Sequence, residues 1–432
     1  MIAAPADKRT VLSWVVFDFA NSAYTTLVVT FVYSTYFVSA IAPDPVTGTA
    51  LWSRGVTLTA LSVAFFSPIL GALADQGGLR KQFLFVSTAV TVAGTAVLYW
   101  IEPGQIFWAL FWFVLSNIAF EFSNVFYNAY LPDIATSKNI GRVSGVGWGV
   151  GYIGGLAAMV VALVAFINPE TPWFGFSTEG GAHIRATCLL VAIWFALFSI
   201  PLFLWVPRTR PLVRSGKAGI IKTGVADLKN TLRDIRRYRQ IVRLLLARMI
   251  YNDGLVTIFA FGGIYAAGTF GFSFQEIMIF GITLNVAAGI GALIMGIFDD
   301  RLGGKKTIQI SNVVLALAVL LAVLAPDKTW FWVSGILVGF FAGPNQSASR
   351  SLLGRFVPAE KENQFYGFFA FSGKLTAFMG PLLLGVMTQA FDSQRAGVSV
   401  VMAFFVVGGL LLARVDETEG IAAARQRNGS TE

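Results

Sequence analysis

The sequence predicts an all-α membrane protein in which twelve transmembrane helices form two six-helix pseudo-repeats, and three observations indicate this fold class. Hydrophobic residues make up 56% of the 432 residues and charged residues 13%, whereas soluble domains carry about 25% charged residues. The apolar residues are gathered in runs near or above the ~20 residues with which a helix crosses a bilayer. A short string that begins at Gly71 recurs at Gly296, so the chain contains an internal duplication.

Twelve apolar runs qualify as spans, and none alternates in the manner of a barrel strand. The first half contains the runs Val11–Ala42, Val56–Leu73, Phe83–Ile101, Ile106–Ala129, Val143–Ile167 and Ala186–Val206. The second half contains the runs Ile241–Ala267, Ile277–Ile297, Ile308–Leu324, Trp330–Ala348, Phe365–Phe391 and Ala396–Ala413. We therefore expect an N-terminal half over residues 1–206, a basic cytoplasmic linker over 207–240, a C-terminal half over 241–414 and a disordered cytoplasmic tail over 415–432.

The distribution of Lys and Arg predicts the side of the membrane that each loop faces. If the N-terminus is cytoplasmic, the basic residues concentrate in the inner segments. The outer segments then contain only Arg54, Arg185, Lys328 and Arg395. This asymmetry is the positive-inside pattern, so we expect both termini in the cytoplasm. The net charge of +9 thus reports topology, and no nucleic-acid partner is expected.

The linker contains an amphipathic pattern. Leu228, Leu232 and Ile235 share one face of a helix among several Lys and Arg side chains. This pattern suits a helix that lies on the anionic inner leaflet. A solvated linker that only obeys the positive-inside rule explains it equally well.

The duplicated string places a short basic turn after the second span of each half. Its shared positions are Gly71, Asp75, Gly78, Arg80 and Lys81 in the first copy and Gly296, Asp300, Gly303, Lys305 and Lys306 in the second. The first glycine permits close helix approach, the aspartate can accept hydrogen bonds from helix N-termini, and the basic pair holds the turn at the inner leaflet. We expect this motif to gate the protein, the alternative being a topology anchor.

A second set of matches aligns the fifth span with the eleventh. Pro132, Gly141, Gly147 and Gly154 correspond to Pro358, Gly367, Gly373 and Gly380 at one constant offset. Two six-span halves of this kind, joined by a basic loop, resemble the major facilitator superfamily over essentially the whole chain. The resemblance implies alternating access around a cavity lined by spans 1, 4, 7 and 10 with parts of 2, 5, 8 and 11. It also implies that the duplicated turns latch an outward-open state.

Four further strings are similar to the vacuole-effluxer-like, autophagy-related branch of that superfamily. They are Phe17–Tyr24, Asn128–Ile134, Gly145–Gly155 and Pro344–Ser351. Phe19 stands where we expect Trp in that branch. Eukaryotic members are linked to amino-acid export during autophagy. The compact size and short loops are more typical of a bacterial inner-membrane protein than of a vacuolar one.

Polar residues inside spans indicate the substrate or proton site, because each charge costs at least ~2.5 kcal/mol at mid-bilayer. Asn117, Glu121, Asn124 and Asn128 form a stripe on one face of span 4, and such a stripe faces water or protein. The complete predicted site is Asp18, Asn21, Tyr24, Asn117, Glu121, Asn124, Asn128, Asn252, Asp253 and Lys374. In it Glu121 can exchange a proton, and Lys374 can neutralise Glu121 or hold a substrate carboxylate.

Structural explanations compete with each of these assignments. Asp18 can cap span 1 or pair with a loop arginine. Asp253 can pair with Arg248 as a structural contact, Glu121 and Lys374 can form a permanent ion pair, and the asparagine stripe can be interhelical contact.

The sequence gives no indication of an enzyme. The string Gly149–Gly154 satisfies the dinucleotide fingerprint, but it lies in an apolar span with no preceding strand, so we interpret it as a packing seam. A single Cys188 and a single His183 exclude a Cys/His metal cluster, and we expect no cofactor.

We therefore expect a secondary transporter, functional as a monomer in the bilayer, for an amino acid or similar amphoteric solute, with proton coupling. The alternatives are an exporter of lipid or drug-like molecules, and a membrane receptor or scaffold on the same fold.

Overall fold

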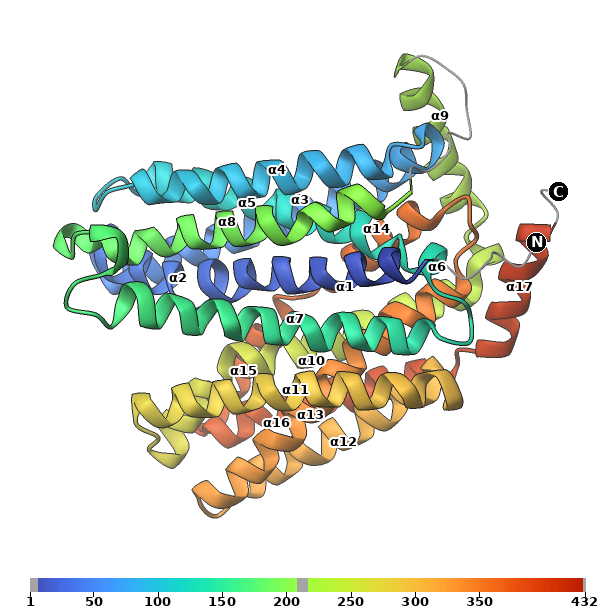
Figure 1. Ribbon diagram of the computed structural model, residues 1–432. Coiled ribbons are helices and arrows are strands. Elements are labelled where there is room, and N and C mark those ends of the chain that lie inside the picture. The colour runs from blue at the N-terminus through green and yellow to red at the C-terminus, as the bar shows by residue number, and fades with distance from the viewer. Residues whose placement is uncertain (1–6, 208–216, 430–432) are drawn as a thin grey trace.

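The computed structural model describes residues 7–207 and 217–429, and this part of the chain is a bundle of long helices that run side by side (Figure 1). The N-terminal half consists of α1 (Lys8–Ala23), α2 (Tyr33–Tyr36), α3 (Pro45–Gly77), α4 (Arg80–Val97), α5 (Ile106–Asn128), α6 (Leu131–Ile134), α7 (Ile140–Ala162) and α8 (Ala182–Trp205). Two π-helical stretches and α2 extend α1 to Ile41, which makes one long first span. The start of α1 and the helix α17 lie at the same end of the bundle, which we call the terminal end.

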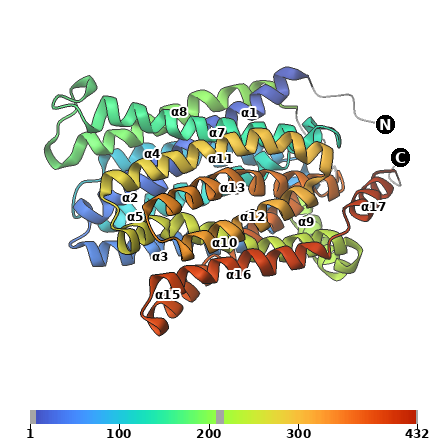
Figure 2. The ribbon, with the colours of Figure 1, turned by 90° about the horizontal axis from the view of Figure 1, so that it is seen from below.

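The C-terminal half repeats this plan after a linker helix, α9 (Lys217–Arg233). It consists of α10 (Arg239–Phe270), α11 (Phe274–Leu302), α12 (Gly304–Leu324), α13 (Lys328–Phe356), α14 (Glu362–Lys374), α15 (Met379–Phe391), α16 (Gln394–Ala413) and α17 (Glu417–Gly429). The two halves meet where α3 packs on α14 and α7 packs on α11. Figure 2 shows α7, from the first half, beside α11, from the second.

Local sequence explains where several helices begin and end. The Asp44 side chain accepts hydrogen bonds from the N–H groups of Val46 and Thr47, and Pro45 occupies the first turn of α3, where its missing N–H has no cost. Gly78 ends the same helix in the left-handed conformation, at φ 61°, which glycine adopts without strain.

The predicted twelve-helix fold is confirmed. One of the expected spans is polar over part of its length, and that part is buried against other helices. Eleven helical segments of the described residues are long and apolar enough to cross a membrane. The remaining expected span, Trp330–Ala348, lies within α13, whose second half is polar from Asn345 to Arg350. Nearly all of that polar segment is buried against other helices, so its polarity never meets lipid.

The eleventh span, predicted as one run over Phe365–Phe391, is broken in the structure. α14 ends at Lys374 and α15 begins at Met379. Pro381 stands near the start of α15, and a proline both lacks an N–H and clashes with the carbonyl four residues earlier, here that of Ala377. The break therefore falls where the proline disfavours a continuous helix.

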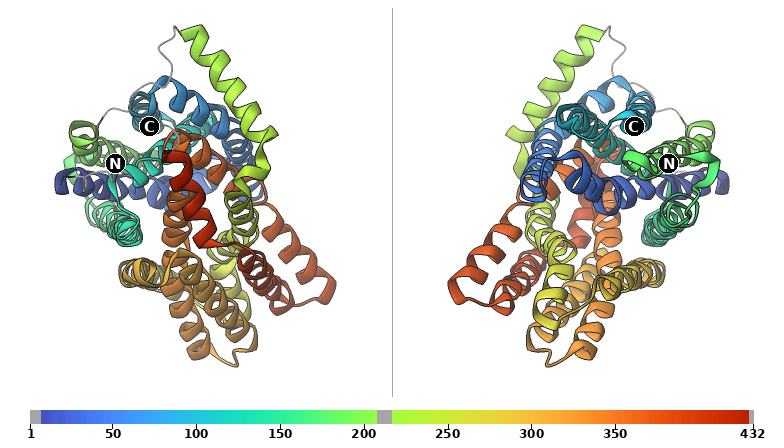
Figure 3. Two further views of the ribbon diagram at one scale, coloured as in Figure 1. Left: turned by 90° about the vertical axis from the view of Figure 1, so that its right-hand side faces the viewer. Right: turned by 90° about the vertical axis from the view of Figure 1, so that its left-hand side faces the viewer.

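The tail was expected to be disordered over 415–432. Its segment Glu417–Gly429 forms the helix α17 on the terminal end of the second half (Figure 3), and residues 430–432 lie outside the described part of the chain. The Glu417 carboxylate accepts hydrogen bonds from the N–H groups of Gly304 and Lys305, both at 3.0 Å. Glu419 pairs with Arg239 at 2.6 Å, and the hydrogen bonds from this guanidinium lower the pKa of Glu419. These contacts to other segments order the tail, and its composition alone does not reveal them.

Candidate functional site

One ion pair joins the two halves in the middle of the bundle. Glu121 on α5 accepts a hydrogen bond from the Lys374 ammonium at 2.7 Å. The two side chains keep 19% and 31% of their surface exposed, so both are partly accessible. Lys374 is the last residue of α14, directly before the break in the eleventh span. The Glu121–Lys374 ion pair considered in the sequence analysis is therefore present, and it connects span 4 with the interrupted eleventh span.

A group of amides continues this polar region into the first span. The Asn21 side chain donates to the Asn124 side chain at 3.3 Å and to the Asp18 carboxylate at 3.5 Å. Tyr24 shares a hydrogen bond of 2.8 Å with Ser116, and Asn117 is buried on α5. The structure thus brings α1 and α5 together along the stripe that the sequence predicts.

The predicted residues of the seventh span surround the broken end of α14. Arg248 stacks over the Phe369 ring, at 3.6 Å from its centre, and donates to the Phe369 carbonyl at 2.8 Å. The Asn252 amide donates to the Gly373 carbonyl at 3.3 Å. The Gly373 carbonyl is one of the last four of α14, which have no partner within the helix, so the Asn252 amide satisfies it.

Asp253 connects the seventh span with the break itself. Thr376 donates to the Asp253 carboxylate at 3.1 Å, and the Asp253 side chain is buried. The second carboxylate oxygen, Oδ2, is buried without a hydrogen-bond partner among the described residues. The alternative pairing of Asp253 with Arg248 is not what the structure shows, because Arg248 bonds to α14 instead.

Asp18 and Asn128 belong to a second cluster that is built around Arg350 of α13. The Arg350 guanidinium lies 3.2 Å from the Asp18 carboxylate and 3.0 Å from the Asn128 amide oxygen, and it stacks over Trp14. It also donates to the Ser144 hydroxyl at 2.9 Å. One arginine of the second half thus ties together α1, α5 and α7 of the first.

Sequence reasoning missed Arg350 because the tenth span was expected to end at Ala348, which leaves Arg350 in a loop. α13 continues to Phe356 instead. The string Pro344–Ser351, which carries part of the family resemblance, was the signal that could have found it.

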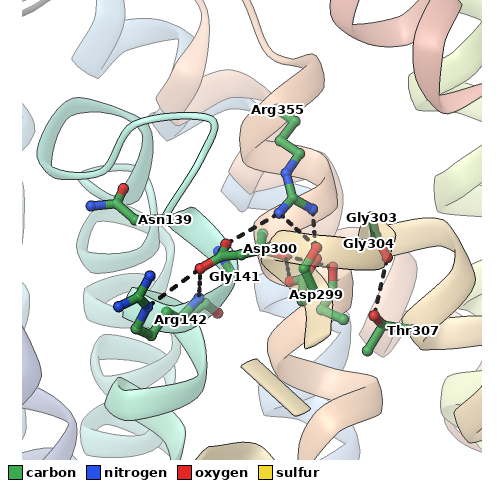
Figure 4. Close-up of polar contacts among 12 residues, drawn as sticks. Asn139, Gly141, Arg142, Asp299, Asp300, Gly303, Gly304, Thr307 and Arg355 are labelled. Atoms are coloured by element: carbon green, nitrogen blue, oxygen red, sulfur yellow. Dashed lines mark hydrogen bonds and ion pairs between the residues drawn. The ribbon is translucent and has the colours of Figure 1, made fainter. Parts of the chain in front are cut away.

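At the terminal end, the duplicated aspartates bind helix N-termini of the opposite half. The Asp75 carboxylate accepts hydrogen bonds from the N–H groups of Asn363 and Gln364, at 3.1 and 2.8 Å, at the start of α14. The Asp300 carboxylate accepts from the N–H groups of Gly141 and Arg142, at 2.7 and 3.1 Å, at the start of α7 (Figure 4). A carboxylate at a helix N-terminus meets free N–H groups and the positive end of the helix dipole. We call these two contacts the Asp75 latch and the Asp300 latch.

The latch glycines allow the helices to touch. A methyl group at Gly71 would overlap the carbonyl of Asn363, and one at Gly296 would lie 3.0 Å from the carbonyl of Gly141. In the structure, Gly141 and Asn363 therefore occupy equivalent positions in the two copies of the contact, whereas the sequence alignment paired Gly141 with Gly367. The two registers differ by one helical turn, so the same face of each helix is used.

The basic positions of the two copies behave differently. The buried Arg80 guanidinium pairs with Asp133 at 2.5 Å and with Glu362 of the second half. Its counterpart Lys305 donates to the Ala413 carbonyl at 2.9 Å, while Lys306 is exposed.

The remaining members of the motif are accounted for locally. In the second copy, Arg355 provides the buried positive charge, at 2.6 Å from Asp299 and 3.6 Å from Asp300. Lys81 donates to the Val206 carbonyl at 2.7 Å. Gly303 adopts φ 92° at its turn. Glu362, Arg355 and Asp299 were missed, and the adjacent acidic pair at 299 and 300 was the available signal for the last of them.

Solved structures define the fold. The chain matches the proton:xylose symporter XylE of the major facilitator superfamily with a TM-score of 0.74 at 14% identity, covering 95% of this chain and 96% of that one. It matches the human organic anion transporter MFSD10 with a TM-score of 0.73 at 16% identity, covering 95% and 100%. The fold is therefore that of the major facilitator superfamily.

Sequence relatives define the family. The family model described as vacuole effluxer Atg22 like matches residues 45–425, and this chain belongs to that family. An uncharacterised MFS-type transporter of Bacillus subtilis is 29% identical over 96% of this chain and 97% of its own length. Autophagy-related protein 22 of Yarrowia lipolytica is 20% identical over 81% of this chain and 73% of its own length. The chain is accordingly a multi-pass membrane transporter of the major facilitator type.

Proposed function

We propose that this transporter carries a small amphoteric solute, such as an amino acid, by alternating access at a site centred on the Glu121–Lys374 pair. The observation that supports this substrate class is a partly exposed pair of opposite charges that belongs to different halves. The carboxylate of an amphoteric solute can take the place of Glu121 at Lys374, while its ammonium group binds Glu121. Neither protein charge is then left unpaired inside the membrane, where an unpaired charge is costly.

Exchange of partners gives the solute a way to drive the conformational change. With no solute, the direct pair holds α5 to α14 at 2.7 Å. A solute inserted between the two charges replaces that contact with two contacts of its own. The solute therefore interacts differently with the two conformations, which is the requirement for any ligand that shifts a conformational equilibrium.

We infer proton coupling from two carboxylates of the site. A proton can neutralise Glu121 when it is bound neither to Lys374 nor to the solute ammonium, and the buried Asp253 has one oxygen without a partner in the described part of the chain. The energy then comes from a proton gradient or from the gradient of the solute itself. In this proposal the Asp75 and Asp300 latches hold the cytoplasmic side closed, and both termini are cytoplasmic in a bacterial inner membrane.

One observation favours the alternative of an apolar solute. A pocket in the second half is lined almost entirely by apolar side chains of α10, α11, α12, α13, α15 and α16, among them Phe261, Phe280 and Phe331. The hydroxyls of its lining residues Thr257 and Ser334 are bonded to carbonyls within the bundle. Such a pocket offers an exporter of lipid or drug-like molecules a place for a hydrocarbon group.

Uptake into proteoliposomes tests the proposal. A labelled amino-acid pool is offered with and without an imposed pH gradient to the wild type, to Glu121→Gln and to Glu170→Gln, an exposed control in a loop at the opposite end from the termini. We expect gradient-driven uptake by the wild type and the control, and a loss of at least tenfold in Glu121→Gln. Gradient-independent uptake that survives in Glu121→Gln would remove this residue from the mechanism. No amino-acid uptake by folded protein would overturn the substrate class in favour of the apolar alternative.

A further inference from the structure

The linker helix α9 lies across the terminal end, and its beginning projects past the edge of the bundle (Figure 3). Its inner face contacts both halves. A methyl group at Gly224 would lie 2.7 Å from the Leu73 side chain of α3. Asp227 pairs with Lys361 at 2.5 Å, and the Thr231 hydroxyl donates to the Gln364 side chain at 3.2 Å. α9 therefore bridges the first half and the beginning of α14.

A second face of α9 is apolar and uncovered by the described part of the chain. Ile221, Val225 and Leu232 are 57%, 37% and 51% exposed. At ~100° per residue they fall within about 40° of arc. The expected hydrophobic face at 228, 232 and 235 therefore differs from the observed one, because Ile235 lies beyond the end of α9.

A third face is basic. Lys222, Lys229 and Arg233 are exposed and lie about 100° further round the same helix. An exposed aliphatic stripe with cations along one flank is the pattern of helices that lie in the headgroup region of a membrane. The stripe lacks the large aromatic side chains that anchor most protein interfaces.

We propose that α9 binds the anionic phospholipids of the cytoplasmic leaflet, with Ile221, Val225 and Leu232 inserted among the acyl chains and the three cations on the headgroups. Charge complementarity selects this partner, since the flank is uniformly basic and the inner leaflet is negative. The position of α9 agrees, because it projects sideways from a membrane-spanning bundle at the end where its linker must meet the surface.

Lipid binding at α9 has a consequence for the Asp75 latch. The Gln364 side chain accepts the hydrogen bond from Thr231 of α9, and the backbone N–H of Gln364 donates to Asp75. Anchoring α9 to the leaflet therefore favours the conformation in which α14 stays against α3. Anionic lipid should stabilise the closed terminal end, whatever solute the protein carries.

Lipid quenching tests the contact directly. A fluorophore is attached at Ile221→Cys in a Cys188→Ser background, and the protein is placed in nanodiscs of phosphatidylcholine with or without phosphatidylglycerol. Nitroxide lipids of each kind then report the contact. We expect at least threefold stronger quenching by nitroxide phosphatidylglycerol than by nitroxide phosphatidylcholine, and loss of that preference in Lys222→Gln/Lys229→Gln/Arg233→Gln. The matched control neutralises Lys8, Lys138 and Arg425, which are exposed elsewhere at the terminal end, and should keep the preference.

Each outcome decides the proposal. Each neutralised cation near an anionic surface should weaken lipid binding by about fivefold. Equal quenching by the two lipids, or equal loss in the control, would overturn the assignment to α9. A label that stays unquenched and becomes shielded only when a soluble cytosolic protein fraction is added would show that a protein covers this face instead.

The latch consequence has its own readout. Spin labels at Lys138→Cys and Glu360→Cys, in exposed loops of opposite halves, report the opening of the terminal end. Phosphatidylglycerol should shift the wild type, but not the neutralised α9 variant, towards the shorter distance. An unchanged distance distribution alongside selective quenching would limit α9 to anchoring. Neither measurement depends on the transported solute, so both remain informative if the proposed substrate is wrong.

Discussion

The Asp75 latch and the Asp300 latch use the same acid and the same kind of backbone donor, but their cations come from different places. In each, a carboxylate accepts two backbone N–H groups at the start of a helix from the opposite half. In the first copy the buried positive charge is Arg80, from the motif itself, which pairs with Asp133 and Glu362. Beside Asp300 it is Arg355, from α13. The comparison indicates that the geometry of closure is set by the duplicated helices, while the charge compensation has diverged.

The largest expected difference between the copies is at their basic position. Arg80→Gln leaves Glu362 buried without its partner, and breaking a buried pair costs about 3–5 kcal/mol. Lys305→Gln removes an exposed ammonium, and such contacts contribute about 1 kcal/mol or less. The thermal unfolding temperature in detergent should therefore fall far more for Arg80→Gln than for Lys305→Gln. Equal losses would mean that the exposed lysine carries an energetic role that the structure does not explain.

A smaller difference is expected at the latch glycines. Gly71→Ala forces the carbonyl of Asn363 to move, because the added methyl would overlap it, whereas Gly296→Ala needs a shift of only a few tenths of an ångström. Overpacking typically costs about 1–3 kcal/mol, and we place Gly71→Ala at the upper end and Gly296→Ala at the lower. The distance between spin labels at 138 and 360 measures the closed population, which should fall more in Gly71→Ala than in Gly296→Ala. A larger fall in Gly296→Ala would contradict the tighter contact seen at Gly71.

Neutralising either of the two duplicated aspartates should have an effect of similar size in the two copies. Asp75→Asn and Asp300→Asn keep one acceptor oxygen but lose the charge that favours a helix N-terminus, which is worth up to about 2 kcal/mol in partly buried sites. Both variants should open the terminal end in the same spin-label measurement, without a large loss of thermal stability. A strong effect in one copy alone would show that the two latches are not equivalent in function.

The smallest effect concerns α17, which packs on α10 and α13 of the second half. The pKa of Glu419 is lowered by its hydrogen bonds from Arg239, so its charged form is favoured when α17 is docked. The contribution of this charge to the docking of α17 is fully present above the ordinary pKa of glutamate, and it is lost as the pH falls through the lowered pKa. The protection of α17 against hydrogen exchange, after correction for the intrinsic pH dependence of amide exchange, should fall in acid in the wild type. In Glu419→Gln this protection should already be lower at neutral pH and should change less on acidification.

The sequence predicted features that are local and missed those that depend on the meeting of distant segments. The duplicated aspartates were visible as a repeat, and their affinity for helix N-termini follows from elementary electrostatics. The partner of Asp18 was not visible, because Arg350 lies far along the chain and only the packing of the halves brings them together. The break after Lys374 had a local signal in Pro381, but apolar content alone suggested a continuous span.

Both latches use main-chain N–H donors, to which the receiving helix contributes through its backbone. Side-chain identity still matters at three of the four positions, because a methyl group at Gly141 would overlap Asp299, the Asn363 amide donates to Asp75 at 2.6 Å, and the Gln364 side chain accepts from Thr231. Position 142, whose side chain is largely exposed, can accumulate substitutions while the contact persists, as long as the helix still begins there. Only proline removes the donor outright. The contact made by Asp300 is thus buffered against mutation at this one donor position and exposed to it at a single carboxylate.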